Sequence, residues 1–97
     1  MIEQSGDSLR VTVPMVIANA SALLEAGRGF LRAGAAASGL VFDLAAVDEA
    51  DSSALTLIFA WLRSARQQGC TLRFVNPPAS MISLAALYGV SDFLPLA

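Results

Sequence analysis

A strand–helix–strand pattern in the middle of the chain constrains the fold more than any other feature. Residues 40–44 are apolar enough for a buried strand, and residues 71–75 predict another. Residues 52–68 between them predict a helix, because apolar side chains recur on one face at three- and four-residue spacing. Two strands joined by a helix are expected to lie parallel in one sheet, with a right-handed crossover. The pattern therefore indicates an α/β fold.

The flanking segments extend this unit on both sides. Residues 9–13 alternate apolar and polar side chains, as a half-buried strand does, and residues 2–4 are expected to pair with them. The other predicted elements are a helix at 19–32, a loop of small residues at 34–39, a helix at 79–88 and an apolar tail at 90–96. We expect a single domain over residues 1–97, with a mostly parallel mixed sheet of about four strands covered by three or more helices.

Composition argues against several classes of function. The six arginines are scattered and the net charge is −2, so neutralisation of nucleic-acid phosphates is not expected. The chain contains neither histidine nor lysine, and Ser52 and Ser53 therefore have no evident base to activate them as nucleophiles. No glycine-rich nucleotide-binding pattern is present. We expect a protein that is not an enzyme and that requires no cofactor and no metal.

Three features of the sequence indicate the cellular compartment of the protein. Cys70 is the only cysteine, which excludes an intramolecular disulfide and fits a reducing environment. The chain does not open with a basic segment followed by an apolar run, so secretion is not expected. The longest near-apolar run, residues 54–62, is too short for a membrane span. We expect a soluble, cytoplasmic domain that does not insert directly into a membrane.

An acidic loop leads into a helix start that carries two adjacent hydroxyls. Asp48, Glu49 and Asp51 precede Ser52 and Ser53. Helix starts expose backbone N–H donors, so Asp51 or Ser52 can cap the helix, and Ser52 can alternatively be phosphorylated or contact a partner. A cation site formed by the three carboxylates is disfavoured, because they lack the ligand spacing and the turn glycine of a calcium loop.

The same helix carries a second apolar stripe outside its main apolar face. Leu57 and Trp61 form this stripe together with Ala54 and Ala65. A helix that is apolar over so wide an arc either packs between two neighbours or presents surface to a partner. The sequence leaves both interpretations open.

Residues 43–55 include Asp43-Leu44, Val47-Asp48 and Asp51-Ser52-Ser53-Ala54-Leu55. This segment resembles the STAS domain family (sulfate transporter and anti-sigma factor antagonist), in which a strand ending in Asp-Leu precedes an acidic loop and Asp-Ser-Ser-Gly or Asp-Thr-Gly-Gly. Residues 84–90, followed by Phe93-Leu94-Pro95, are similar to the closing helix and tail of the MlaB-like branch. That branch supplies the small STAS subunit of a bacterial ABC phospholipid transporter that maintains outer-membrane lipid asymmetry.

The resemblance implies a non-catalytic, protein-binding subunit. It would dock on the ATPase subunit of an ABC transporter, in a complex with the permease, and so lie peripheral to the inner membrane. Ser52 would be the central contact or a phospho-acceptor. The other expected contact residues are Asp48, Asp51, Ser53, Ala54, Leu57 and Trp61. The alternative is an anti-sigma factor antagonist switched by phosphorylation of Ser52, and a sensor of small ligands is a third class without a pocket signature. The apolar composition also predicts weak self-association.

Overall fold

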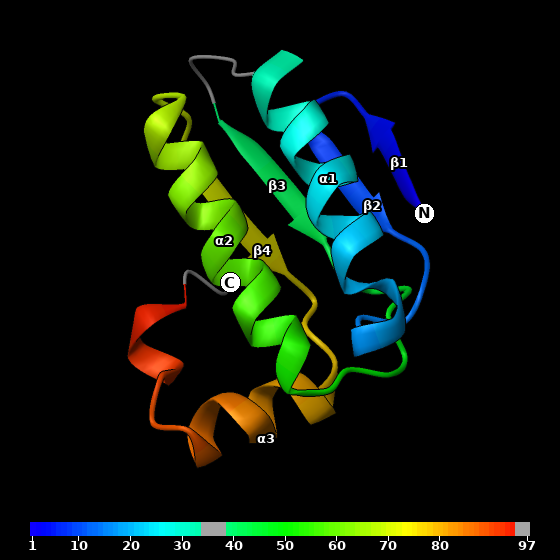
Figure 1. Cartoon of the computed structure of the whole chain (residues 1–97), viewed down its shortest axis with the longest axis vertical. Coiled ribbons are helices and arrows are strands. Elements are labelled where there is room, and N and C mark those ends of the chain that lie inside the picture. The colour runs from blue at the N-terminus through cyan, green and yellow to red at the C-terminus, as the bar shows by residue number, and fades with distance from the viewer. Residues whose placement is uncertain (34–38, 95–97) are drawn as a thin grey trace.

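The computed structural model describes residues 1–33 and 39–94, and its centre is a four-stranded sheet (Figure 1). The strands lie in the order β1 (Ile2–Ser5), β2 (Ser8–Val11), β3 (Leu40–Asp43) and β4 (Leu72–Val75). β1 pairs antiparallel with β2, whereas β2, β3 and β4 are parallel. The predicted mixed, mostly parallel sheet is therefore confirmed. The loop expected at 34–39 falls largely outside the described residues.

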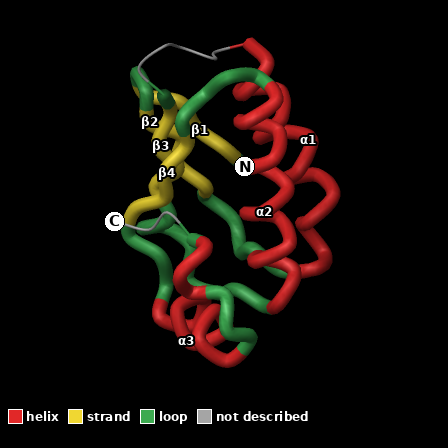
Figure 2. The backbone as a smooth tube through the Cα atoms, turned by 90° about the vertical axis from the view of Figure 1, so that its left-hand side faces the viewer, coloured by secondary structure: helices red, strands yellow, loops and turns green. Residues whose placement is uncertain are grey.

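Two long helices cover one face of this sheet, and a third closes one end. α1 (Ile17–Ala33) and α2 (Ser52–Gln67) lie side by side on that face, and α3 (Ala79–Leu87) lies near the start of α2 (Figures 1 and 2). A short 3₁₀ turn (Ser91–Phe93) follows α3. Within the two described ranges, every helix is too short or too polar to cross a lipid bilayer.

Two boundaries of strands and helices differ from the prediction by two residues, and several others differ by one. The strand expected to reach residue 13 ends at Val11, shortly before Pro14, whose missing N–H cannot join a ladder. The helix expected from residue 19 begins at Ile17. Its first N–H donates to the carboxylate of Asp51, 3.0 Å away, so a residue from a distant part of the chain sets this helix start.

An aromatic stack forms the centre of the core between the sheet and α2. Phe42 and Phe74 are register partners on β3 and β4, and their ring centroids lie 5.5 Å apart. Trp61 of α2 stacks on Phe42 at 4.3 Å and is fully buried. Leu57 and Ala54 are buried on the same helix. Of the two interpretations of the second apolar stripe, packing within the domain is therefore correct.

The burial of Trp61 depends on a glycine in the neighbouring helix. The indole N–H donates to the carbonyl of Leu24 at 3.3 Å, and the ring crosses α1 at Gly27. A Cβ atom at Gly27 would overlap the indole ring. Gly29, two residues later in the same helix, faces open space. The close approach of α1 and α2 therefore requires glycine at position 27 and not at position 29.

We expect opposite effects of alanine at these two glycines. Gly27→Ala should lower the free energy of unfolding by about 1–3 kcal/mol, because the methyl group overpacks the contact with Trp61. Gly29→Ala, the matched control, should raise it by about 0.5–1 kcal/mol through helix propensity. Urea unfolding followed by circular dichroism measures both. Equal stability of the two variants would contradict this packing.

Candidate functional site

The loops that precede α1 and α2 are joined by backbone hydrogen bonds. Because β2 and β3 are parallel neighbours, both loops leave the same edge of the sheet. The N–H of Met15 donates to the carbonyl of Glu49 at 3.0 Å, and the N–H of Asp51 donates to the carbonyl of Met15 at 3.2 Å. The Met15 side chain is buried beneath this junction. The two helices therefore begin next to each other.

One carboxylate caps both helix starts. Oδ1 of Asp51 accepts a hydrogen bond from the backbone N–H of Ser53 at 2.9 Å and a second from the Ser53 hydroxyl. Oδ2 accepts the N–H of Ile17 at 3.0 Å. The negative charge also lies at the positive end of two helix dipoles. Asp51 is thus the N-cap of α2 and a tie to α1, which goes beyond the single cap that the sequence suggested.

Hydrogen bonding lowers the pKa values of two carboxyl groups at this edge of the sheet. The bond from the Ser53 hydroxyl, followed by the bond from the N–H of Ile17, lowers the pKa of Asp51 below its usual value. The N–H of Ala45 and then the side-chain amide of Asn76 do the same for the pKa of Asp43. Both groups are therefore carboxylates at neutral pH.

The two neighbouring serines have different environments. The hydroxyl of Ser53 donates to Asp51, and the residue is half-buried. Ser52 is exposed, and its hydroxyl has no hydrogen-bond partner among the residues that the structure describes. Ser52 is therefore the serine whose hydroxyl a partner or a kinase can reach, and Ser53 has a structural role in the cap.

The other expected contact residues separate into exposed and buried ones. Asp48 is exposed in the loop before the helix, as is its neighbour Glu49, which was not among the expected contacts. Ala54, Leu57 and Trp61 are at most 4% exposed, because α1 and the sheet cover them. The expectation that these three side chains offer an exposed contact surface is corrected accordingly. They instead fix the position of α2, and Leu57 also lines a cavity between α1 and α2.

The exposed surface beside Ser52 includes residues that the sequence did not single out. A cavity of about 250 Å³ on one side of α2 is lined by Ser52, Thr56, Phe59 and Tyr88. A second cavity, of about 300 Å³ and between α1 and α2, includes Thr56 and Ile17. Ile17 is 75% exposed. Only the tertiary arrangement joins these residues, because they come from α1, from α2 and from the residue that follows α3.

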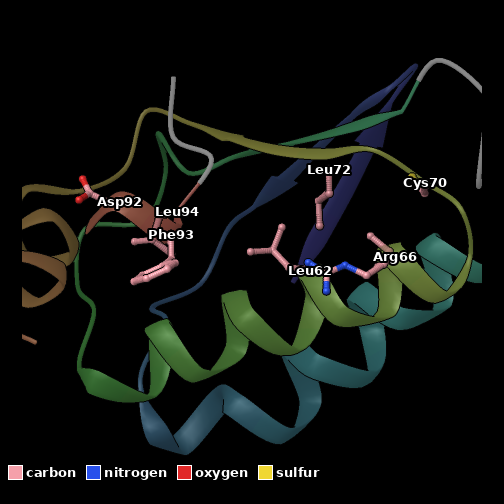
Figure 3. Close-up of a pocket in the computed structure, with 8 residues that line it drawn as sticks. Leu62, Arg66, Cys70, Leu72, Asp92, Phe93 and Leu94 are labelled. Carbon is pink, nitrogen blue, oxygen red and sulfur yellow. The ribbon is translucent and has the colours of Figure 1, made fainter. Parts of the chain in front are cut away.

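Another cavity lies toward the other end of α2, and its described lining residues do not form a catalytic arrangement. It measures about 440 Å³ and is bounded by Leu62 and Arg66 of α2, Leu72 of β4, and Phe93 (Figure 3). Cys70 also lines it, but this thiol is buried. Among residues 1–33 and 39–94, no three His, Cys, Asp or Glu side chains are grouped as a metal site would require.

Comparisons with known proteins agree with this fold. A family model described as "Mlab, STAS domain" matches residues 2–96. A Thermotoga maritima structure described as an anti-sigma factor antagonist is 19% identical with a TM-score of 0.76, covering 99% of this chain and 83% of that chain. The Bacillus cell fate determinant SpoIIAA in its phosphorylated form is 14% identical with a TM-score of 0.68, covering 100% and 89%. At these identities the likeness to the solved structures concerns the fold alone. No curated protein matches the sequence.

The shared cap predicts that Asp51 stabilises the domain more than its neighbours do. Asp51→Ala should lower the midpoint of thermal unfolding, because two helix starts lose an acceptor. Asp48→Ala removes an exposed carboxylate from the same loop and should leave the midpoint unchanged. Equal midpoints for the two variants would contradict the cap.

The difference in thermal unfolding midpoint between the wild type and Asp51→Ala should depend on pH, because hydrogen bonding lowers the pKa of Asp51. The carboxylate stabilises the folded state at pH values above the unfolded pKa, about 3.9 for aspartate. That contribution is lost as the pH falls through the lower folded-state pKa. The gap between wild type and Asp51→Ala should therefore be constant from about pH 8 to pH 5 and shrink below about pH 4. Calorimetric scans across this range measure it.

Proposed function

The chain belongs to the STAS domain family, and on this basis we propose that it docks as a non-catalytic subunit on the ATPase of an ABC phospholipid transporter. One structural observation carries the proposal. The exposed hydroxyl of Ser52 stands on a helix start that Asp51 holds in place, with cavities on both sides of the helix. Such a surface suits recognition by a protein, because its groups are already ordered before binding.

The chemistry of the site supports binding over catalysis. Ser52 would need a base to act as a nucleophile, and the sequence has no histidine or lysine. The nearest carboxylate, that of Asp51, is held in its charged form by three hydrogen bonds from Ile17 and Ser53. The proposed role is therefore thermodynamic: a subunit that binds one conformation of the ATPase more tightly shifts the population toward it.

The matching family model, with its MlaB description, supports a transporter as the partner. In this role the chain sits with the ATPase and the permease at the inner face of the membrane, without inserting into it. Asp48 and Glu49 extend the contact beyond Ser52 with two exposed negative charges. They would face basic side chains of the ATPase and speed the encounter between the subunits.

A second candidate is an anti-sigma factor antagonist that is switched by phosphorylation. The likeness in fold to structures described as anti-sigma factor antagonists, SpoIIAA among them, and the exposed hydroxyl of Ser52 support it. A phosphate there would add about −1.5 to −2 charges close to Asp48, Glu49 and Asp51. Repulsion from these carboxylates would oppose the attraction of the helix start, so modification would release a docked partner.

Affinity capture from the native cells tests the proposal. We expect the tagged chain to recover an ABC ATPase together with its permease. Ser52→Asp should reduce the recovered ATPase by at least about tenfold, whereas Ser52→Ala should retain most of it. Ser5→Asp, an exposed serine at the end of β1, is the charge-matched control and should bind as the wild type does.

A different set of captured proteins would distinguish the two candidate functions. Recovery of a protein kinase in place of the ATPase, with phosphate on Ser52 by mass spectrometry, would overturn the transporter role in favour of the sigma-factor switch. Loss of the ATPase with Ser5→Asp as well would show that added charge, and not position 52, weakens the complex.

A further inference from the structure

The surface along which α1 and α2 meet has a groove, here called the α1/α2 seam. The two helices run in the same direction because they follow parallel strands, and they lie side by side (Figure 1). The cavity in the seam measures about 300 Å³. It is lined by Ile17, Ala20 and Leu24 of α1 and by Thr56, Leu57 and Ala60 of α2. Small side chains at positions 20 and 60 keep the seam open, while Ile17 stands at its edge, three-quarters exposed.

The two ends of the seam carry opposite charge. The exposed carboxylates of Asp48 and Glu49 lie at the helix starts, where Glu49 is bonded to the segment just before Ile17. At the other end, Arg28 and Arg32 of α1 line the next hollow between the helices, together with residues of α2. Arg28 already pairs with Glu25 at 3.3 Å and donates to the hydroxyl of Ser64, so Arg32 contributes most of the positive charge there. Arg32 is exposed in the last turn of α1. A partner that lies along the whole seam would therefore contact negatively charged, then apolar, then positively charged surface.

We propose that the seam receives one amphipathic helix of the ATPase partner, which places an apolar side chain in the cavity. This inference rests on the proposed function. A helix fits because it can pack along the groove between two others with its apolar side chains at three- and four-residue spacing. Charge complementarity sets its polarity: its basic end lies over Asp48 and Glu49, and its acidic end lies near Arg28 and Arg32.

The helix dipoles favour the same orientation of the partner helix. Basic residues are stabilising in the last turn of a helix and acidic residues in the first. A partner helix with a basic last turn over Asp48 and Glu49 therefore runs antiparallel to α1 and α2. Its partial negative C-terminus then lies beside the partial positive starts of both helices, so charge and dipole favour the same orientation.

Filling the cavity tests the inference. Ala20→Trp places a large side chain in the seam, whereas Ala22→Trp adds the same side chain at an exposed position of α1 outside the seam. With the full chain and the purified ATPase subunit, titration calorimetry should show at least about tenfold weaker binding for Ala20→Trp. Ala22→Trp should stay within about twofold of the wild type. Ile17→Asp is a second variant in case Ala20→Trp fails to fold, and it should also weaken binding about tenfold.

Charge reversal tests the orientation. The double variant Asp48→Lys, Glu49→Lys should slow association with the ATPase and reverse the effect of added salt on the association rate. Arg32→Glu should slow association in the same way. Stopped-flow measurements at two salt concentrations separate these effects from any change in the dissociation rate.

The binding results for these variants test the seam and the proposed function separately. ATPase binding by Ala20→Trp and Ile17→Asp at wild-type strength, with loss for Ser52→Asp, would overturn the seam and leave the proposed function intact. A wild-type chain that binds no ATPase overturns both. Self-association of the wild type that Ala20→Trp abolishes, with ATPase binding unchanged, would make a second copy of this chain the occupant and overturn the ATPase helix.

Discussion

The carboxylate of Asp51 is the group on which the arrangement of the site depends. It accepts hydrogen bonds from the first N–H of α1 and from the N–H and hydroxyl of Ser53 in α2, so a single charge fixes two helix starts. The backbone bonds of Met15 on either side of Ala50 hold the same two loops together. Ser52 and Ile17 are therefore held in a fixed relation, although they lie far apart in the sequence.

This rigidity explains how a site without catalytic groups can still be specific. Because the hydroxyl of Ser53 is committed to the cap, Ser52 alone presents a hydroxyl at the start of α2. A partner that fits the surface loses little entropy in ordering it. A phosphate at the same position would instead add charge beside the capping carboxylate. The same geometry is thus compatible with constitutive docking and with a switch, and the identity of the partner decides between them.

The sequence predicted the elements well where the signal was local. The helix expected over 52–68 is observed over Ser52–Gln67, and the strand expected over 40–44 ends one residue early at Asp43. Periodicity and caps are properties of neighbouring residues, which is why they were sufficient. The bond from Ile17 to Asp51 and the fit of Trp61 against Gly27 each join residues 34 apart along the chain. Such contacts leave no periodic signal, so the start of α1 and the burial of Trp61 needed the structure.

Site-specific photo-crosslinking in the native cells tests directly whether the surface around the start of α2 contacts an ABC ATPase. A photoreactive amino acid at Thr56 lies on exposed α2 surface between the two cavities. The same amino acid at Arg73, exposed on β4, reports on a different surface of the domain. We expect an adduct with the ATPase from position 56 and none from position 73. An ATPase adduct from position 73 alone, or a kinase adduct from position 56, would contradict it.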